Sequence, residues 1–378
     1  MAARRNAPRS IEKEHHPWDT LIFQGGGALG AYEGGAYEGL AGAGFDFDVV
    51  AGVSIGAVNA AIVASRGKDA VIHLARFWDA ASDRYADLPM GDESLRRWVA
   101  SSKAAIFGNP GMFVPRWIEE PWAMGTDLRW THLYDPGPLR NLISAHVDFP
   151  RLSSSPRRLL MTAVDVQTGE LALFDSRSEE MTPSHVLASG SLPPAFPPVR
   201  IGERYYWDGG LVTNTPLKTV LGVLPPKDQR RAVLIELFPR AHKLPQSFPE
   251  VLNTVKDLTY MTKVDVDRKD CERDNAACDA VNQFLRSLEP TLATRLASTT
   301  AYGTLCERHH NHVDVYRLTH SMDLGEQESK DYDFSPTSIR RHWVEGRKAA
   351  KEAIAQWEGR VDWSPFRCHG RALVDLLA

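Results

Sequence analysis

Gly52-Val53-Ser54-Ile55-Gly56 has the form G-x-S-x-G, with an apolar run at residues 47–51 before it and a helix-forming run at residues 57–64 after it. A serine on so tight a turn from strand to helix takes strained backbone angles, and glycine on either side avoids collisions with both elements. The turn lifts the hydroxyl above the N-terminus of the helix, where partial positive charge favours a developing anion. This pattern predicts a nucleophile at Ser54; close packing of helix on strand, without chemistry, is the alternative.

A second glycine turn precedes this one. Residues 20–24 form a short apolar run that stops at Gly25-Gly26-Gly27, and residues 28–42 have helical composition. Backbone N–H groups freed at a glycine turn can bind the oxygen of a carbonyl under attack. The sequence therefore predicts an oxyanion hole at Gly25, Gly26 and Gly27, with a purely structural turn as the alternative.

Gly25, Gly27 and Gly30 also fit the G-x-G-x-x-G pattern of dinucleotide-binding proteins. That pattern needs an acidic residue at the end of the next strand, whereas Asp46 and Asp48 stand at its beginning. We therefore expect no nucleotide cofactor at this turn.

Asp208-Gly209-Gly210 follows a short strand expected at residues 204–207. An aspartate at a strand end, beside glycines that let other backbone come close, could take the proton from Ser54 and return it to a leaving group. The alternative is an aspartate that starts a tight turn, for which Asp-Gly is a common signal.

The bulk properties argue against several classes of function. The 378 residues include 44 basic and 48 acidic side chains, spread along the chain, so we expect no nucleic-acid partner. The four cysteines lack zinc-binding or redox spacing, and neither a metal nor an organic cofactor is expected. No signal-peptide core and no membrane-spanning stretch stand out. These features predict a cytoplasmic protein that is at most peripheral at a membrane; they give no oligomeric state.

Residues 108–138 are rich in tryptophan, proline and glycine. Such a cover segment could line an acyl pocket or touch a membrane surface. The alternative is that its aromatic side chains fix an irregular loop to the body.

The pattern changes after residue 240. Residues 248–288 are long, helical and charged, and residues 313–318 are a strand candidate. Ser335 as N-cap and Pro336 as first residue begin a final amphipathic helix. We expect this helix to dock on its own domain, with a membrane-surface role as the alternative.

Together, Gly25-Gly26-Gly27-Ala28-Leu29-Gly30, the Ser54 turn, the bend at residues 188–197 and Asp208-Gly209-Gly210 strongly resemble the patatin-like phospholipase family. The resemblance covers roughly residues 18–240. It implies an α/β fold, a three-layer α/β/α sandwich with a mostly parallel central sheet. Residues 1–17 would then be an N-terminal tail, and residues 241–378 a mainly helical C-terminal extension like that of a bacterial subgroup.

The resemblance also implies the chemistry, that of a lipid acyl hydrolase of the phospholipase A or esterase type. Ser54 matches the nucleophile and Asp208 its base in a serine–aspartate dyad, which would act through an acyl-enzyme without any cofactor. Gly25, Gly26 and Gly27 match the oxyanion loop of the family. Five further glycines belong to the matching motifs and support the turns: Gly30, Gly52, Gly56, Gly209 and Gly210. One departure is Leu29, because many members carry a basic residue there. The sequence does not tell how the missing charge bears on headgroup preference or on rate.

Three alternatives stay open at this point. One is an ordinary Ser-His-Asp hydrolase that uses a later histidine, the candidates being His242, His309, His310, His312 and His320. A second is a thioesterase or polyester depolymerase with the same dyad. The third is a non-catalytic protein that binds lipid or associates with membranes.

Overall fold

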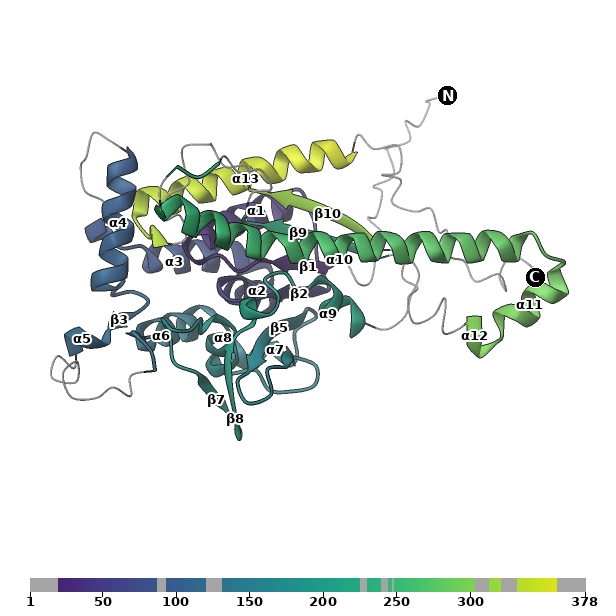
Figure 1. Ribbon diagram of the computed structural model, residues 1–378, viewed down its shortest axis with the longest axis horizontal. Coiled ribbons are helices and arrows are strands. Elements are labelled where there is room, and N and C mark those ends of the chain that lie inside the picture. Colours follow the sequence, from purple (N-terminus) through teal and green to yellow (C-terminus); the bar gives the residue numbers. More distant parts are fainter. Residues whose placement is uncertain are drawn as a thin grey trace, which may run out of the picture.

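A computed structural model of the chain (Figure 1) describes residues 20–86, 93–119, 131–224, 230–238, 244–246, 248–302, 313–320 and 332–358. The expected tail at residues 1–17 lies outside this range. The strands are β1 (Thr20–Phe23), β2 (Val49–Gly52), β3 (Val114–Pro115), β4 (Tyr134–Asp135), β5 (Arg158–Asp165), β6 (Leu171–Asp175), β7 (Val199–Ile201), β8 (Arg204–Asp208), β9 (Arg230–Glu236) and β10 (Val313–Thr319).

The α-helices are α1 (Gly30–Gly42), α2 (Ile55–Arg66), α3 (Ala70–Ala81), α4 (Glu93–Phe107), α5 (Arg116–Glu119), α6 (Gly137–His146), α7 (Phe149–Leu152), α8 (Pro183–Gly190), α9 (Leu217–Gly222), α10 (Phe248–Arg286), α11 (Pro290–Ala297), α12 (Thr300–Tyr302) and α13 (Pro336–Glu358). Short 3-10 helices are η1 (Gly27–Leu29), η2 (Gly67–Asp69), η3 (Arg84–Ala86) and η5 (Gly209–Leu211).

The central sheet has the strand order β10-β9-β1-β2-β5-β8-β7, and β6 pairs with β5. The strands from β10 to β5 in this order run parallel, whereas β6, β8 and β7 join through antiparallel pairs. In the middle, β1 and β2 pair with Phe23 opposite Gly52. Because both strands end there, the two glycine turns emerge beside each other at one edge of the sheet.

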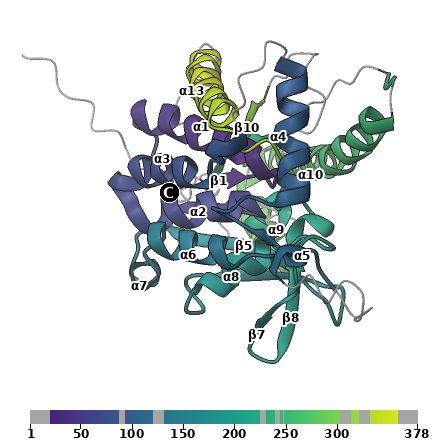
Figure 2. The same ribbon diagram turned by 90° about the vertical axis from the view of Figure 1, so that its left-hand side faces the viewer.

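Alternate residues of the central strands face opposite layers, as the period of a strand requires. Leu21 and Val50 pack into a cluster with α1, α2, α3, α8 and α13, whereas Ile22 and Ala51 pack against α9 and α10. Figure 2 shows α1, α2 and α3 on one side of the sheet and α9 and α10 on the other. The three-layer α/β/α sandwich predicted from the sequence is confirmed.

Elements beyond residue 240 take part in this sandwich. β10 extends the sheet by pairing in parallel with β9 along its whole length, and α13 packs lengthwise on α1. Ser335 accepts a hydrogen bond from the Ser338 N–H at 3.4 Å, as expected of the N-cap of α13. α10 crosses the sheet and projects beyond the body, where α11 and α12 follow it (Figure 1). Elements on both sides of residue 240 build one sheet, so the sheet does not mark a domain boundary there. The boundary at residue 240 stays a prediction.

The crossing of α1 and α13 depends on glycine. A Cβ atom at Gly346 would lie 2.0 Å from the Tyr32 carbonyl oxygen, whereas one at Gly42 would meet no atom within 4 Å. Gly346→Ala is expected to lower the free energy of unfolding by about 1–3 kcal/mol or more, since the helices must move apart. Gly42→Ala, the control in α1, is expected to be neutral or to stabilise by up to about 1 kcal/mol. Urea denaturation measures both, and equal effects would contradict this packing.

Candidate active site

Ser54 lies at the turn between β2 and α2. Its φ of 56° makes it the one non-glycine residue with positive φ in the described part of the chain, a costly conformation for a residue with a Cβ atom. A Cβ at Gly52 would lie 2.2 Å from the Gly56 carbonyl oxygen, and one at Gly56 would lie 2.7 Å from that of Phe23. Glycine at both positions therefore lets the strand, the turn and the helix close around the serine.

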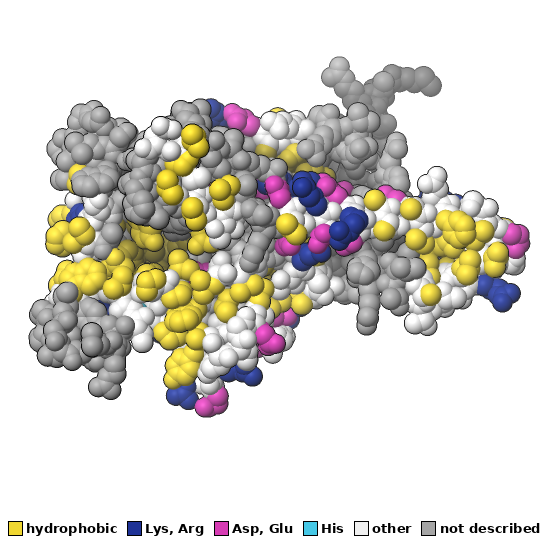
Figure 3. Space-filling model, in the orientation of Figure 1, with side chains coloured by type: hydrophobic (Ala, Val, Ile, Leu, Met, Phe, Trp, Pro, Cys, Tyr) yellow, Lys and Arg dark blue, Asp and Glu magenta, His cyan; other side chains and the backbone are white. Residues whose placement is uncertain are grey.

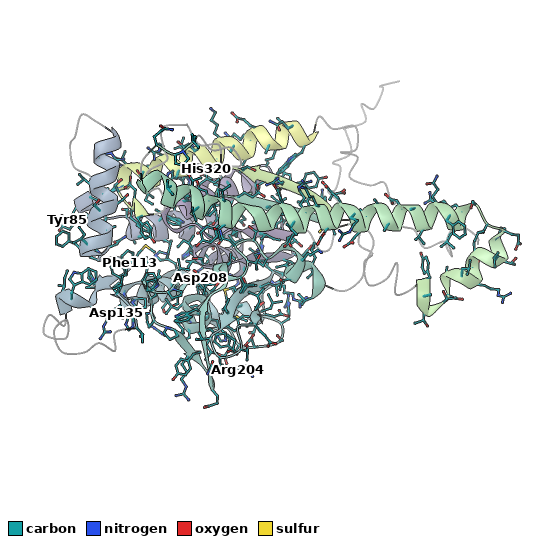
Figure 4. All side chains as sticks on the ribbon, viewed as in Figure 1. Tyr85, Phe113, Asp135, Arg204, Asp208 and His320 are labelled. Carbon is teal, nitrogen blue, oxygen red and sulfur yellow. The ribbon has the colours of Figure 1, made fainter. Side chains whose placement is uncertain are left out.

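Asp208 lies at the end of β8, labelled in Figure 4, and is 2% exposed. Its carboxylate hydrogen-bonds the Ser54 side chain and accepts a hydrogen bond from the Gly210 N–H at 2.7 Å. Burial raises the pKa of Asp208 to about 7, against the smaller lowering effect of these two hydrogen bonds. A carboxylate with that pKa can both accept and return a proton near neutral pH.

The segment at residues 189–191 holds the serine and the aspartate together. The Ser54 N–H donates to the Ser189 carbonyl oxygen at 3.0 Å and to its hydroxyl at 3.1 Å. The Ser189 hydroxyl donates in turn to the Thr162 carbonyl oxygen of β5 at 2.8 Å. The Asp208 N–H donates to the Ser191 carbonyl oxygen at 3.0 Å. The bend that the sequence placed before the aspartate is thus hydrogen-bonded to both residues.

The glycine loop borders Ser54 on the other side. A Cβ at Gly25 would lie 3.0 Å from the Ser54 Cβ, so only glycine lets the loop come this close. Gly26 and Gly27 stand at the start of η1, and within the described residues their N–H groups donate no hydrogen bond. Unpaired N–H groups at a helix start attract an anion. The structure therefore brings Ser54, Asp208 and the predicted oxyanion loop into one place.

Asn214 is a site residue that the sequence did not suggest. It is 4% exposed, and its Nδ2 donates to the Gly25 carbonyl oxygen at 2.8 Å, while the Gly25 N–H donates to the Asn214 carbonyl oxygen at 3.4 Å. These two bonds clamp the glycine loop to the segment that follows Asp208. A single asparagine in a loop carries no pattern by which sequence analysis could have found it.

Asn214→Ala is expected to lower kcat by about 10- to 100-fold with little change in KM, because the loop loses its clamp but keeps its own donors. Asn275→Ala is the matched control, since Asn275 clamps the backbone of Val313 through two 3.1 Å hydrogen bonds far from Ser54. Steady-state ester hydrolysis separates the two variants. A kcat for Asn214→Ala equal to that of the control would show that the clamp does not serve the reaction.

Buried polar side chains of α1, α2 and α3 hold the glycine loop in place. The Glu33 carboxyl of α1 accepts hydrogen bonds from the Gln24 N–H and from Asn59 Nδ2, the latter at 2.8 Å. Asn59 Nδ2 also donates to the Gly30 carbonyl oxygen at 2.9 Å, and Trp78 Nε1 donates to Asn59 Oδ1 at 3.1 Å. Burial raises the pKa of Glu33 well above its usual value. Both ends of the loop are thereby fixed.

Aromatic side chains from three segments meet near the site. The Phe113 ring contacts Tyr134, Phe196 and Phe334 at centroid distances of 5.0, 5.6 and 6.3 Å. Figure 3 shows a hollow lined by hydrophobic side chains in the region where Figure 4 places Phe113 and Asp208. The described part of the cover segment at residues 108–138 is thus fixed to the body by its aromatic side chains, while residues 120–130, with Trp122 among them, lie outside the described range.

The segment before α13 joins this aromatic cluster to α4. Asp333 is 2% exposed and pairs with Arg96 of α4 at 3.6 Å. Arg96 also donates to the hydroxyls of Ser335 at 2.8 Å and Ser338 at 3.1 Å. This buried network holds Phe334 against Phe113, so the residues after 240 help to form the wall of the hollow.

Tyr260 of α10 also lies near the site. Burial and the negative charge of Asp208 raise the pKa of its phenol, and its ring packs against Phe238 at 5.1 Å. A side chain whose pKa responds to the charge of Asp208 lies near that residue. The C-terminal region therefore contributes to the surroundings of Asp208.

One candidate histidine of the Ser-His-Asp alternative falls within the described residues. His320 follows β10, and β9 and β1 separate that strand from β2. Three strand spacings amount to about 14 Å, and the His320 ring faces Tyr32 at 4.6 Å and His342 at 5.9 Å. His320 is thus not brought to Ser54. The candidates His242, His309, His310 and His312 lie outside the described residues.

Comparisons with known proteins give the family that the chain resembles in sequence. A family model described as "Patatin-like phospholipase" matches residues 21–221, and one described as "Patatin phospholipase" matches residues 258–363. The uncharacterized NTE family protein Rv2565 of Mycobacterium tuberculosis is 30% identical over 216 residues, which make up 57% of this chain and 28% of that protein. The uncharacterized protein YqhO of Bacillus subtilis is 27% identical over 258 residues, covering 62% of this chain and 79% of that protein.

Among solved structures, VipD from Legionella pneumophila aligns with a TM-score of 0.40 at 14% identity, covering 90% of this chain and 67% of that one. The chain spans 28% of the length of the mycobacterial relative, little more than a quarter.

Proposed function

Because the chain belongs to the patatin-like phospholipase family, we propose that it hydrolyses acyl esters of lipids through Ser54 and Asp208. The observation that carries this proposal is the buried Asp208 carboxylate, hydrogen-bonded to a strained serine that the glycine loop borders. A serine and a base within hydrogen-bond reach, next to free N–H donors, form an acyl-transfer site.

The reaction would proceed in two steps. Ser54 Oγ attacks the ester carbonyl carbon while Asp208 accepts the hydroxyl proton, and the N–H groups of the loop at residues 25–27 hold the oxyanion. Asp208 then protonates the leaving alcohol, which gives an acyl-enzyme. Water attacks the acyl-enzyme with Asp208 as base and releases the fatty acid. The pKa of about 7 supports both roles of Asp208.

Leu29 stands where many family members carry a basic residue. Its side chain is 1% exposed, within η1 directly after the glycine loop. An apolar, buried side chain supplies no charge to the oxyanion or to an anionic headgroup. We therefore propose that the loop N–H groups carry the stabilisation of the oxyanion.

Fatty acid release from phospholipid vesicles by the wild type and by Ser54→Ala tests the proposed function. A panel of short p-nitrophenyl esters, an acyl thioester and a polyester is run in parallel. Phospholipid turnover that depends on Ser54 supports the proposal. Turnover of the thioester or the polyester alone would mean that the same two residues act on that substrate class instead of on phospholipids. If no substrate is turned over but vesicles are still bound, the non-catalytic lipid-binding alternative is favoured.

Contact with a membrane surface is part of this proposal. Among the described residues, no helix combines the length and apolar character needed to cross a bilayer. Tyr85, Ile106, Phe107 and Ile118 are 80, 53, 60 and 51% exposed, and Figure 3 shows hydrophobic side chains gathered beside α4 at the edge of the hollow. Exposed apolar side chains next to a lipid-hydrolysing site support peripheral docking there.

Phe107→Ser is expected to slow hydrolysis of vesicle phospholipid by about tenfold or more, because burying one such side chain in lipid contributes about 1.5–3 kcal/mol. Hydrolysis of a soluble p-nitrophenyl ester should stay unchanged. Phe284→Ser is the matched control, since Phe284 is also 60% exposed but lies near the far end of α10. A Phe284→Ser variant that slows vesicle hydrolysis as much as Phe107→Ser would rule out docking beside α4.

A further inference from the structure

A second cluster of polar side chains lies away from the candidate active site. His320, after β10, and His342 and Glu345 of α13 each offer one ligand atom, and these atoms lie within 4.8 Å of one another. His320 and His342 are 1% and 2% exposed, and the Glu345 side chain is 37% exposed. Figure 4 shows His320 close to α13 and well separated from Asp208. The hydrolysis derived above uses none of the three residues.

The type and spacing of these donors suit zinc. Zinc takes imidazole nitrogen and carboxylate oxygen at about 2.0–2.2 Å, so two ligands of a tetrahedral ion are about 3.3–3.5 Å apart. His320 Nε2 and Glu345 Oε2 lie 3.3 Å apart. His342 and Glu345 are three residues apart in α13, which puts them on one face of the helix. A small inward movement of the third ligand would complete three protein ligands.

Buried groups around the cluster lack partners of their own. Within the described residues, neither His320 Nδ1 nor the Tyr32 hydroxyl has a hydrogen-bond partner, and the Tyr32 ring stands edge-on to His320 at 4.6 Å. Buried polar groups without partners are rare and call for an explanation such as an ion.

Arg341 is the positive charge that such a site must accommodate. Its Nε lies 3.6 Å from Glu345 Oε1, and its Nη2 lies 3.4 Å from His342 Nε2. Because Arg341 contacts Oε1, Glu345 Oε2 stays directed at His320. Carboxylates that bind a metal commonly have such a partner on the other oxygen.

We propose that His320, His342 and Glu345 bind one zinc ion, with a water molecule as the fourth ligand. The ion joins the end of β10 to α13, which packs on α1 directly behind the glycine loop. It is structural and takes no part in ester hydrolysis. The competing explanation is a hydrogen-bonded His320–Glu345 pair that binds no metal.

The test uses the full-length chain, stripped with a chelator, incubated with zinc chloride and desalted. Elemental analysis is expected to give one zinc per chain, and zinc should raise Tm by several degrees. A chain that retains no zinc and shows no change in Tm would overturn the proposal in favour of the hydrogen-bonded pair.

Variants test which residues hold the ion. Glu345→Gln keeps the shape and a hydrogen bond to His320, yet should weaken zinc binding by more than about 100-fold, because even losing an outer partner of a ligand costs 10- to 100-fold. His342→Gln, the second variant, should weaken it as well. Glu352→Gln, the control two turns further along α13, should bind zinc as the wild type does. Wild-type affinity in both ligand variants would refute the assignment.

Discussion

Ser54→Ala is expected to lower kcat for ester hydrolysis by about four orders of magnitude or more, since removing the nucleophile of a serine hydrolase leaves only the residual effect of the oxyanion hole and binding. The fold should stay intact. Alanine fits the same space, and the N–H of residue 54 keeps its hydrogen bonds to Ser189. Hydrolysis of a p-nitrophenyl ester measures the loss, and circular dichroism checks the fold.

Loss of the Ser54 hydroxyl also separates the chemistry from lipid binding. The variant should still bind vesicles as the wild type does, because none of the exposed apolar side chains beside α4 has changed. If Ser54→Ala kept more than about a tenth of the activity, another group would be the nucleophile, and the glycine-flanked turn would only pack a helix on a strand.

Asp208→Asn is expected to reduce kcat by about 10³- to 10⁴-fold, because the amide cannot accept the Ser54 proton. Asparagine keeps the shape, and its Oδ1 can still accept the hydrogen bond from the Gly210 N–H. An aspartate that only starts a tight turn would lose little activity on this change. The kinetic measurement therefore separates the base from the turn-forming alternative.

The pH dependence follows from the same carboxyl group. If Asp208 is the base, it must be ionised to act, and burial raises its pKa to about 7. The kcat/KM of the wild type should therefore rise with pH and level off above about pH 7. A profile that is already flat from pH 5 upward would mean that a group of ordinary carboxyl pKa acts as base.

The free energy of unfolding should fall as pH rises, whereas kcat/KM should increase. Because the pKa of Asp208 is raised in the folded state, the folded chain binds its proton more tightly than the unfolded chain does. The resulting stabilisation is complete below about pH 4 and is lost as pH rises through about 7. Asp208→Asn removes this dependence, so its Tm relative to wild type should increase between pH 4 and 8. A Tm difference that stays constant from pH 4 to 8 would contradict a raised pKa of Asp208 in the folded state.

Local patterns predicted the elements on which the proposed active site is built. Glycines on either side of Ser54 and the triple glycine after β1 are short-range signals, and each marks a strand, a turn and a helix that the structure contains. The apolar stripe of the last helix likewise predicted its docking, since Ile339, Ala350 and Trp357 are buried in the main cluster.

Features that depend on distant parts of the chain could not be predicted in this way. The two hydrogen bonds of Asn214 join positions 189 residues apart, and a single polar residue in a loop looks the same with or without them. The pairing of β10 with β9 and the approach of Tyr260 to Asp208 depend on how the helices pack after residue 240. β7 follows Pro197-Pro198, whose composition favours a bend over a strand.

The most direct test of the account is intact-mass and peptide analysis after reaction with a fluorophosphonate, which labels activated serines. One adduct per chain on Ser54 is predicted, with labelling of Asp208→Asn slowed in proportion to its loss of kcat. An adduct on another serine, or labelling of Ser54 that does not depend on Asp208, would contradict a serine–aspartate dyad.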